Sequence, residues 1–264
     1  WQGADRVQLQ QRLTLMVILK KPDEIAKARA SNRIVAEALS VLREKVKPGV
    51  TTLELDRIAE GIAHKRGARP AFKGYRGYPF ALCASVNEEV VHGMPSKRVL
   101  VEGDIIGLDF GVYHQGFCGD SAITLPVGRV GEKAARLMEV TERSLYVAIE
   151  QALPGKRLGD ISAAVQTTAE EAGYSVVRDF VGHGIGRDMH EDPQIPNFGK
   201  KGRGIELKAG MILAIEPMVN EGGYKVKILA DGWTAVTQDG SLSAHFEHSV
   251  AITDNGPEIL SRLS

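Results

Sequence analysis

The stretch of residues 103–125 (GDIIGLDFGVYHQGFCGDSAITL) constrains the fold more than any other part of the chain. It predicts two β-strands joined by a hairpin turn, and each strand carries one carboxylate, Asp109 or Asp120, within an apolar run. A turn centred on His114 and Gln115 would place the two aspartates directly opposite each other, with their Cβ atoms roughly 4.5–5.5 Å apart. Two carboxylates that close on an apolar surface repel each other and lose hydration, so they must share a proton or cations.

Two alternatives stay open for this pair of aspartates. They would be solvated if the strand face were exposed, and a bulge at Gly116 would shift the register of the hairpin. The solvated pair is disfavoured because apolar side chains leave little solvent-exposed face on either strand. These side chains are Ile105, Ile106, Leu108, Phe110, Ala122 and Ile123.

The size and composition of the chain narrow the class of protein. With 264 residues it can bury a large core, in one large domain or in two packed halves. Lysine plus arginine and aspartate plus glutamate both number 33, with no long basic run, which disfavours nucleic acid as the main partner. Cys83 and Cys118 are too few for a disulfide framework and lack the spacing of a structural zinc site. We expect a cytoplasmic protein without a signal peptide or a membrane span, since no apolar run approaches ~20 residues.

Residues 1–15 begin with tryptophan and show no clear periodicity. We expect them to be a poorly ordered N-terminal extension, a cloning remnant or translated upstream sequence, with Met16 fitting a native start. Residues 16–264 would then form a single domain.

Helical spacing of apolar residues recurs in two places along the chain. The first helix is expected at about residues 22–47, and a second helix begins at a capping box formed by Thr51 and Glu54. A similar pair of helices is expected at residues 133–152 and 158–172. The order of elements therefore repeats.

The strand that ends on Asp109 also has a counterpart. Residues 103–109 (GDIIGLD) align without gaps with residues 210–216 (GMILAIE), and both stretches end a buried strand on an acid. We therefore expect an α/β fold of two related halves that pack about a pseudo-two-fold axis. Their equivalent strands would meet, so that Asp109 and Glu216 converge. The two halves span about residues 22–128 and 129–264.

A final strand is expected at residues 243–253 (SAHFEHSVAIT). It adds Glu247 among apolar neighbours, and alternation along a strand puts His245 and Ser249 on the same face as Glu247.

The acids on these apolar strands, with one histidine in a glycine-flanked loop, suit a metal site. Four carboxylates balance the charge of two divalent cations, and an oxygen-rich set with one imidazole suits Mn, Fe, Co or Zn. A dinuclear site of this kind can bridge a hydroxide as nucleophile and polarise a carbonyl. Taken singly, a histidine is more often a loop or core residue than a ligand. The candidate ligands are Asp109, Asp120, His183, Glu216 and Glu247.

Several motifs in combination resemble the bacterial type I methionine aminopeptidases, which have the pita-bread fold. They are GYRGYP, SVNEEVVHGMP, GDIIGLDFG, GFCGDSA, VVRDFVGHGIGRDMHEDPQIPNF, LKAGMILAIEPM and DGWTAVTQDGSLSAHFEH, and the similarity covers about residues 21–260. The resemblance implies two pseudo-symmetric halves of antiparallel strands covered by helices. It also implies that the five candidate residues hold two divalent ions, drawn from Co, Mn, Fe, Zn and Ni, in a single catalytic domain.

The family pattern implies roles for other residues as well. His92 and His190 would flank the scissile bond, and Glu216 would double as a proton shuttle. Ordinary packing is the alternative for the aromatic residues of the implied methionine pocket. The residues implied to form that pocket are Tyr75, Tyr78, Cys83, Met189 and Trp233.

The implied activity is the hydrolytic removal of the initiator methionine, by a metal-bridging hydroxide, from nascent proteins and peptides with a small second residue. The implied partners are N-terminal methionyl peptides and nascent chains, with a transient ribosome contact, no nucleic acid and no membrane, and the chain is expected to be a monomer. Two alternatives stay open. One is an activity of the Xaa-Pro aminopeptidase or prolidase type, and the other is a non-catalytic, peptide-binding member of the same fold.

One residue departs from the family pattern. Similar enzymes usually have glutamine where this chain has His245, two residues before Glu247. The departure bears on the hydrogen bonding near the metal site and leaves the expected ligand set unchanged.

Overall fold

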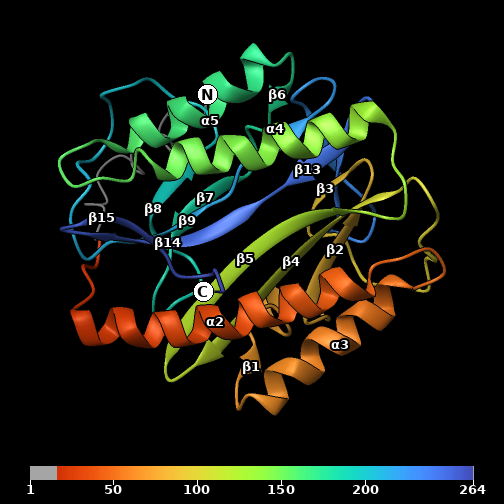
Figure 1. Ribbon diagram of the computed structural model, residues 1–264, viewed down its shortest axis with the longest axis horizontal. Helices are drawn as coiled ribbons and strands as arrows, with labels where there is room; N and C mark the ends of the chain where they lie inside the picture. Colours follow the sequence, from red (N-terminus) through yellow and green to blue (C-terminus); the bar gives the residue numbers. More distant parts are fainter. Residues whose placement is uncertain (1–16, 264) are drawn as a thin grey trace, which may run out of the picture.

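The computed structural model describes residues 17–263, so the expectation for residues 1–15 lies outside the described residues. Two pairs of helices lie over opposite halves of a layer of strands (Figure 1). The first pair is α2 (Pro22–Lys45) and α3 (Thr52–Lys65), and the second is α4 (Glu132–Ile149) and α5 (Leu158–Glu171). The bounds expected from the spacing of apolar residues lie within three residues of the observed ones for α2, α4 and α5, and α3 begins where its capping box predicts.

The strands are short except for one long hairpin. In the first half they are β1 (Arg69–Pro70), β2 (Leu82–Val86), β3 (Glu89–Val91), β4 (Ile105–His114) and β5 (Phe117–Pro126), with a 3₁₀ turn η1 (Tyr75–Gly77). In the second half they are β6 (Ser175–Val176), β7 (Val181–Gly184), β8 (Glu191–Pro196), β9 (Ile212–Ile215), β10 (Met218–Asn220), β11 (Val226–Ile228), β12 (Ala235–Thr237), β13 (Ser243–His245), β14 (Glu247–Thr253) and β15 (Gly256–Ile259).

Within residues 17–263, the main sheet has nine strands, seven of them in the order β1-β4-β5-β14-β9-β7-β8. Strand β2 also pairs with β4, and β15 also pairs with β14, and neighbouring strands run antiparallel. One core lies between this sheet and the helices α2 and α3, and a second core lies under α4 and α5. The expected α/β fold of two halves, with antiparallel strands covered by helices, is therefore confirmed.

The hairpin β4–β5 forms as expected, but its register was predicted wrongly. The turn is centred on Gln115 and Gly116, which both have positive φ (51° and 78°), and Asp109 lies opposite Ala122 instead of Asp120. A two-residue turn with both φ values positive matches the twist of the flanking strands, and glycine adopts such values without strain. Because this shift changes each pairing by two residues, Asp109 and Asp120 become diagonal neighbours on the same face.

The two helix pairs begin in the same way, as the internal repeat predicts. The backbone N–H of Thr51 donates to Glu54 Oε2 at 2.7 Å, and that of Arg157 donates to Asp160 Oδ2 at 2.8 Å. In both places a carboxylate three residues into the helix satisfies a backbone donor that the helix itself leaves free.

The repeated strands β4 and β9 do not adjoin. Strands β5 and β14 lie between them in the main sheet, so the prediction that equivalent strands meet was wrong. Each strand still follows a glycine with positive φ, 96° at Gly103 and 94° at Gly210. Asp109 on β4 and Glu216 just after β9 nevertheless line one cavity.

The final strand expected at residues 243–253 is divided into β13 and β14, which belong to different sheets. The division falls at Phe246, whose backbone N–H donates to the carbonyl of Pro217 at 3.3 Å. Pro217 lies between β9 and β10 and has no N–H to return a ladder bond, so the ladder is interrupted there and resumes in the same register at Met218 and His245. The break puts His245 and Glu247 at strand ends on either side of it.

None of the helices in residues 17–263 combines the length and the apolar character that crossing a bilayer requires.

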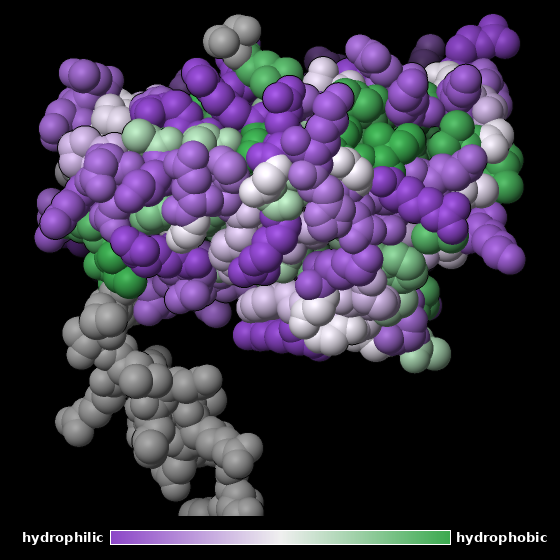
Figure 2. Space-filling model, turned by 90° about the horizontal axis from the view of Figure 1, so that it is seen from below, coloured by the Kyte–Doolittle hydropathy of each residue, from purple (hydrophilic) through white to green (hydrophobic). Residues whose placement is uncertain are grey.

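The face formed by α2 and α3 is covered mainly by hydrophilic side chains (Figure 2). This is the outward face of amphipathic helices, whose apolar residues, such as Leu39, Leu42 and Leu55, are buried against the sheet.

Candidate metal centre and substrate pocket

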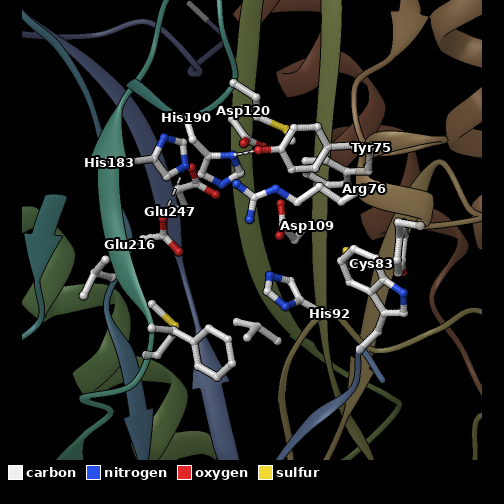
Figure 3. Close-up of a pocket in the computed structure, with 18 of the residues that line it drawn as sticks. Tyr75, Arg76, Cys83, His92, Asp109, Asp120, His183, His190, Glu216 and Glu247 are labelled. Atoms are coloured by element: carbon white, nitrogen blue, oxygen red, sulfur yellow. Dashed lines mark hydrogen bonds and ion pairs between the residues drawn. The ribbon is translucent and has the colours of Figure 1, made fainter. Parts of the chain in front are cut away.

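A cavity of about 260 Å³ is lined by residues from both halves of the chain. Every site residue predicted from the sequence lines this cavity; His183, Glu216 and Glu247 lie on one side of it, Cys83 lies on the other, and His92 lies apart from His183 and His190 (Figure 3). The predicted residues that line it are Tyr75, Tyr78, Cys83, His92, Asp109, Asp120, His183, Met189, His190, Glu216, Trp233 and Glu247.

Acidic side chains gather at the buried end of this cavity. Asp120, His183 and Glu247 each offer a ligand atom, and these three atoms lie within 4.8 Å of one another. Among residues 17–263, the buried oxygens Asp109 Oδ1, Asp120 Oδ1 and Glu247 Oε1 have no hydrogen-bond partner. Buried acceptors without donors are costly, and a bound cation would satisfy all of them.

The electrostatics of the cluster favour a cation too. Burial, and then the charge of Asp120, raises the pKa of Asp109 well above its usual range. Burial raises the pKa of Asp120 to about 7. Burial together with the neighbouring carboxylates raises the pKa of Glu216 and that of Glu247. Buried carboxylates therefore hold protons unless positive charge enters the site.

His183 presents a free nitrogen to the cluster. Its Nδ1 lies 2.9 Å from the carbonyl oxygen of Gly184, which can only accept, so Nδ1 carries the proton. Burial lowers the pKa of His183 to about 3, so the ring is neutral and Nε2 is a bare acceptor. This Nε2 lies 3.5 Å from Glu216 Oε1, a second acceptor. Two acceptors facing each other in this way fit a metal ion bound between them, with the backbone carbonyl orienting the imidazole.

A glycine makes room for the acids of the hairpin. Gly111 lies directly across the ladder from Asp120. A Cβ atom at Gly111 would lie 2.9 Å from the Phe72 ring and 3.1 Å from Asp120 Oδ1. The missing side chain therefore leaves the carboxylate of Asp120 free to face the cavity.

His245 also reaches this cluster, although it was expected only to share a strand face with Glu247. Its side chain is buried, and its Nε2 lies 3.6 Å from Glu216 Oε2. Burial lowers the pKa of His245 to about 3, so this imidazole is neutral. Glu216 therefore lies between two imidazoles, one facing each of its carboxylate oxygens.

His190 and His92 lie on different sides of the cavity (Figure 3). The Nδ1 atom of His190 lies 3.0 Å from the hydroxyl of Tyr75, and the ring centroids of His190 and His183 are 4.3 Å apart. His92 contacts Phe180 edge to face, with the ring centroids 5.4 Å apart, and its φ of 59° is unusual for a side chain of this size. Burial lowers the pKa of His92 to about 4 and also lowers the pKa of His190, so both rings are neutral at pH 7.

Hydrogen bonds and ring packing hold the aromatic side of the cavity in place. The Tyr78 hydroxyl lies 3.1 Å from the carbonyl oxygen of Leu82 and 3.0 Å from that of Gly93, so it donates to the backbone and turns the ring toward the cavity. Trp233 packs edge to face on Tyr78 with 5.1 Å between the ring centroids. With the thiol of Cys83, which is buried, they form an apolar wall.

The turn that carries Met189 and His190 is held by a buried ion pair. Lys20 contacts Glu191, and both side chains are nearly inaccessible to solvent. Glu191 Oε1 also accepts the backbone N–H of Arg187 at 2.8 Å, and the backbone N–H of Met189 donates to the Tyr113 hydroxyl at 3.1 Å.

Some residues of the cavity were missed by sequence reasoning. Arg76 extends into the cavity toward His190 (Figure 3), with its guanidinium carbon 5.3 Å from the centre of the Tyr75 ring. It lies inside the GYRGYP motif, which is the sequence signal for it, and its φ in the structure is 49°. Phe180 could have been suggested by its place just before the VGHGIG loop. The other lining residues that were not predicted are Phe72, Val91, Asp179, Val181 and Met218.

Comparison with known proteins agrees with this geometry. Residues 26–254 match the profile of metallopeptidase family M24. A methionine aminopeptidase of Clostridium perfringens is 56% identical over 245 residues, which cover 93% of this chain and 98% of that protein. The crystal structure of a methionine aminopeptidase from Thermotoga maritima has a TM-score of 0.93 and 50% identity, covering 94% of this chain and all of that one.

A prolidase from Pyrococcus furiosus is similar in fold, with a TM-score of 0.75 at 23% identity, and the match covers 99% of this chain and 68% of that chain. The pita-bread fold implied by the sequence motifs is thereby confirmed. Because the family profile spans residues 26–254 and a relative that is 56% identical matches 93% of the chain, the chain belongs to metallopeptidase family M24.

Proposed function

We propose that this protein is a metal-dependent aminopeptidase that removes the N-terminal methionine from peptides and nascent proteins with a small second residue. One observation carries the proposal: a cluster of buried, unpartnered carboxylate oxygens lies in the same cavity as an apolar wall of aromatic and sulfur-containing side chains. Relatives that are 50–56% identical are methionine aminopeptidases, which supports the same activity here.

The proposed cofactors are two divalent ions, from among Co, Mn, Fe, Zn and Ni. Four carboxylates balance the charge of two such ions, and the free Nε2 of His183 adds a nitrogen ligand. When bound, such ions supply Lewis-acid polarisation of a carbonyl and a lower pKa for water. The residues that would hold them are Asp109, Asp120, His183, Glu216 and Glu247.

Glu216 is suited to moving a proton. Its carboxylate lines the cavity beside the other acids, where it would accept a proton during the reaction and release it to the departing amine. Its two oxygens lie beside the Nε2 atoms of His183 and His245, which keep it at the edge of the cluster that faces the cavity.

His190 is placed to stabilise negative charge on the carbonyl oxygen of the scissile bond. When the Tyr75 hydroxyl donates to Nδ1, the neutral His190 ring carries its proton on Nε2, which can donate to that oxygen. His92 is neutral as well and lies beside Phe180 and Trp233, where it would contact the departing amide.

The apolar wall selects the side chain of the first residue. An unbranched thioether gains dispersion and sulfur–aromatic contacts from Tyr78 and Trp233, and it meets two further sulfur atoms at Cys83 and Met189. Because the Tyr78 hydroxyl is occupied by backbone carbonyls, this wall offers little to a polar side chain.

The wider setting follows from the same proposal. Residues 16–264 form one catalytic domain with halves at about 22–128 and 129–264, and the protein acts as a monomer in the cytoplasm on nascent chains, with a transient ribosome contact. Neither nucleic acid nor a membrane takes part.

A peptide panel tests the proposal. The protein is freed of metal with a chelator and then assayed with Mn, Co, Fe, Zn or Ni against Met-Ala-Ser, a peptide with a bulky second residue, and an Xaa-Pro peptide. Release of methionine from Met-Ala-Ser alone is the expected result. Cleavage of Xaa-Pro peptides only would give the prolidase-type activity, and no cleavage by the metal-loaded protein would leave a peptide-binding protein.

A further inference from the structure

His245 has an unusual position for a histidine without an assigned role. It ends β13 and pairs with Met218 on β10, and its side chain is only 3% exposed. Its Nε2 is buried and has no hydrogen-bond partner among residues 17–263. A buried polar nitrogen without a partner costs free energy, so its surroundings should contain a group for it.

The group that this nitrogen faces is a carboxylate oxygen of Glu216. The distance from His245 Nε2 to Glu216 Oε2 is 3.6 Å, just beyond a hydrogen bond, and a small side-chain rotation would close it. If Nε2 carried a lone pair, it would repel the carboxylate. If Nε2 carried the proton, the same contact would be a hydrogen bond to a charged acceptor, which is stronger than a neutral one.

The other oxygen of Glu216 has a different neighbour. Its Oε1 lies 3.5 Å from His183 Nε2, which is a bare acceptor because His183 donates from Nδ1 to the Gly184 carbonyl. Glu216 therefore has one oxygen that faces a bare acceptor, where a cation fits between them, and one oxygen that faces His245 Nε2, whose protonation no other contact fixes. The different neighbours of its two oxygens favour one orientation of the Glu216 carboxylate.

We propose that His245 is a positioning residue of the metal centre, whose Nε2–H donates to Glu216 Oε2 and holds Glu216 Oε1 toward His183 and the bound ions. The inference rests on the proposed metal centre and deepens it. Hydrogen bonds to ligating carboxylates orient the ligand, and removing them typically lowers metal affinity by about 10- to 100-fold.

The matched variants at this position are His245→Gln, His245→Asn and His245→Leu. Glutamine, the residue that similar enzymes carry, places its amide nitrogen near the position of Nε2 and can still donate. Asparagine keeps an amide but is too short to reach Glu216, and leucine has no donor. Because glutamine and asparagine carry the same amide and differ in length, comparing these two variants shows whether the donor must reach Glu216. This comparison remains informative if the leucine variant folds poorly.

The readout is metal binding in the absence of any peptide. Metal-free wild type and variants are titrated with Co²⁺ and Mn²⁺ by calorimetry, and the visible absorption of bound Co²⁺ is recorded. We expect the metal affinity of His245→Gln to lie within about threefold of that of wild type, with an unchanged Co²⁺ spectrum. In His245→Asn and His245→Leu, we expect the affinity for at least one of the bound ions to fall by about 10- to 100-fold. Equal affinity in all four proteins would overturn the inference, and so would a Co²⁺ spectrum altered in His245→Gln, because it would make His245 a ligand.

A double-mutant cycle checks that His245 acts through Glu216. In a Glu216→Gln background, His245→Asn should cause no further loss of affinity, whereas a loss of the same size as in wild type would contradict the inference. His248→Leu serves as a control, since this half-buried histidine lies on β14 beside Tyr146 and Ser261 and does not line the cavity. A wild type that binds no divalent ion would overturn the proposed metal centre and this inference together, while normal peptide cleavage with equal variant affinities would overturn this inference alone.

Discussion

Lys20 and Glu191 form a buried ion pair that fastens the segment before helix α2 to the turn that presents His190 to the cavity. Glu191 also accepts backbone N–H groups of that turn, at 2.8 Å from Arg187 and 3.3 Å from Asp188. The pair thus connects the beginning of the described chain with a catalytic candidate more than 160 residues later. Removing the pair should therefore lower both the stability of the protein and its activity.

Replacing Lys20 with methionine should destabilise the protein by about 3–5 kcal/mol, because it leaves the carboxylate of Glu191 buried without its counter-charge. Activity with Met-Ala-Ser should also fall, since the turn carrying His190 loses an anchor. Denaturant unfolding and initial rates give the two measurements. The control is Lys27→Met, which removes an exposed pair with Asp23 at 3.9 Å and should change stability by less than about 1 kcal/mol. Similar effects of both substitutions would show that the buried pair contributes no more to stability and activity than an exposed pair does.

Glu216→Gln and His183→Ala should each reduce turnover by at least about 100-fold, the lower range for loss of a positioned acid–base group or ligand. Both variants should keep their circular dichroism spectra, since these side chains line a cavity and lie outside the packed cores of the helices. Rates of peptide cleavage at saturating metal test the expectation. Wild-type rates in either variant would contradict the site assignment.

The stability of the metal-free protein should fall as the pH rises above about 6.5. The pKa of Asp120 is raised from 3.8 to about 7, and those of Asp109, Glu216 and Glu247 are raised as well. A carboxyl whose pKa is higher in the folded state contributes stability that is present below its unfolded pKa and lost as the pH rises through the folded pKa. Each such proton changes the free energy of unfolding by up to about 1.4 kcal/mol per pH unit.

The buried histidines act in the opposite direction at lower pH. The pKa values of His183 and His245 are lowered to about 3 and that of His248 to about 4, so their stabilising contribution is complete above pH 6.5 and is lost as the pH falls toward 4. Between about pH 4 and 6.5 the carboxyls and the histidines oppose each other, whereas above pH 6.5 only the carboxyls still lose protons, so thermal melts of the chelated protein from pH 4 to 9 should show a melting temperature that falls above about pH 6.5. A melting temperature that keeps rising above pH 7 would refute the prediction.

Adding Mn²⁺ or Co²⁺ should raise the melting temperature, and the increase should be larger at pH 8 than at pH 6. Metal binds the ionised carboxylates, which the folded protein otherwise disfavours at high pH, and ligand binding stabilises the folded state by mass action. An ion present at about 100 times its dissociation constant should raise the free energy of unfolding by roughly 2.7 kcal/mol. The opposite ordering of the two pH values would argue against binding by the buried acids.

Trp233→Leu should weaken the preference for methionine over norleucine at the first position by up to about tenfold. Sulfur–aromatic contacts contribute about 0.3–1.5 kcal/mol, and norleucine has the same shape as methionine without the sulfur. Ratios of kcat/KM for Met-Ala-Ser and norleucyl-Ala-Ser measure the effect. Unchanged selectivity would place the methionine side chain away from Trp233.

The sequence allowed much of the site to be predicted because acids in buried strands are rare without a reason. Asp109 and Asp120 interrupt strongly apolar runs, and the internal repeat pointed from Asp109 to Glu216. The register was wrong because the choice between His114-Gln115 and Gln115-Gly116 as the turn depends on local φ values that a pattern of apolar residues does not contain. The predicted register differs from the observed one by two residues, so the prediction that both carboxylates face the same side of the sheet was nevertheless correct.

The contacts between distant segments at the strand ends could not be predicted from the sequence. Nothing in the alternation of residues 243–253 announces that the strand changes sheets at Phe246, because the cause is Pro217 in a neighbouring chain segment. The contact between His245 and Glu216 depends on the register of this pairing, in which His245 lies opposite Met218 and His248 lies opposite Ile215. Arg76 was missed for a related reason, since a charged residue in a turn is ordinarily solvated, and only its φ and its neighbours direct it into the cavity.

The position of β14 in the main sheet has a consequence for synthesis of the chain. This strand lies between β5 and β9, yet it is made after both of them. Until β14 emerges, β5 and β9 each present an open edge of unpaired backbone groups, the kind of surface that recruits other strands and promotes aggregation. The two halves are thus joined by their last long strand, and Glu247, at its first residue, completes the acid cluster at the moment the sheet closes.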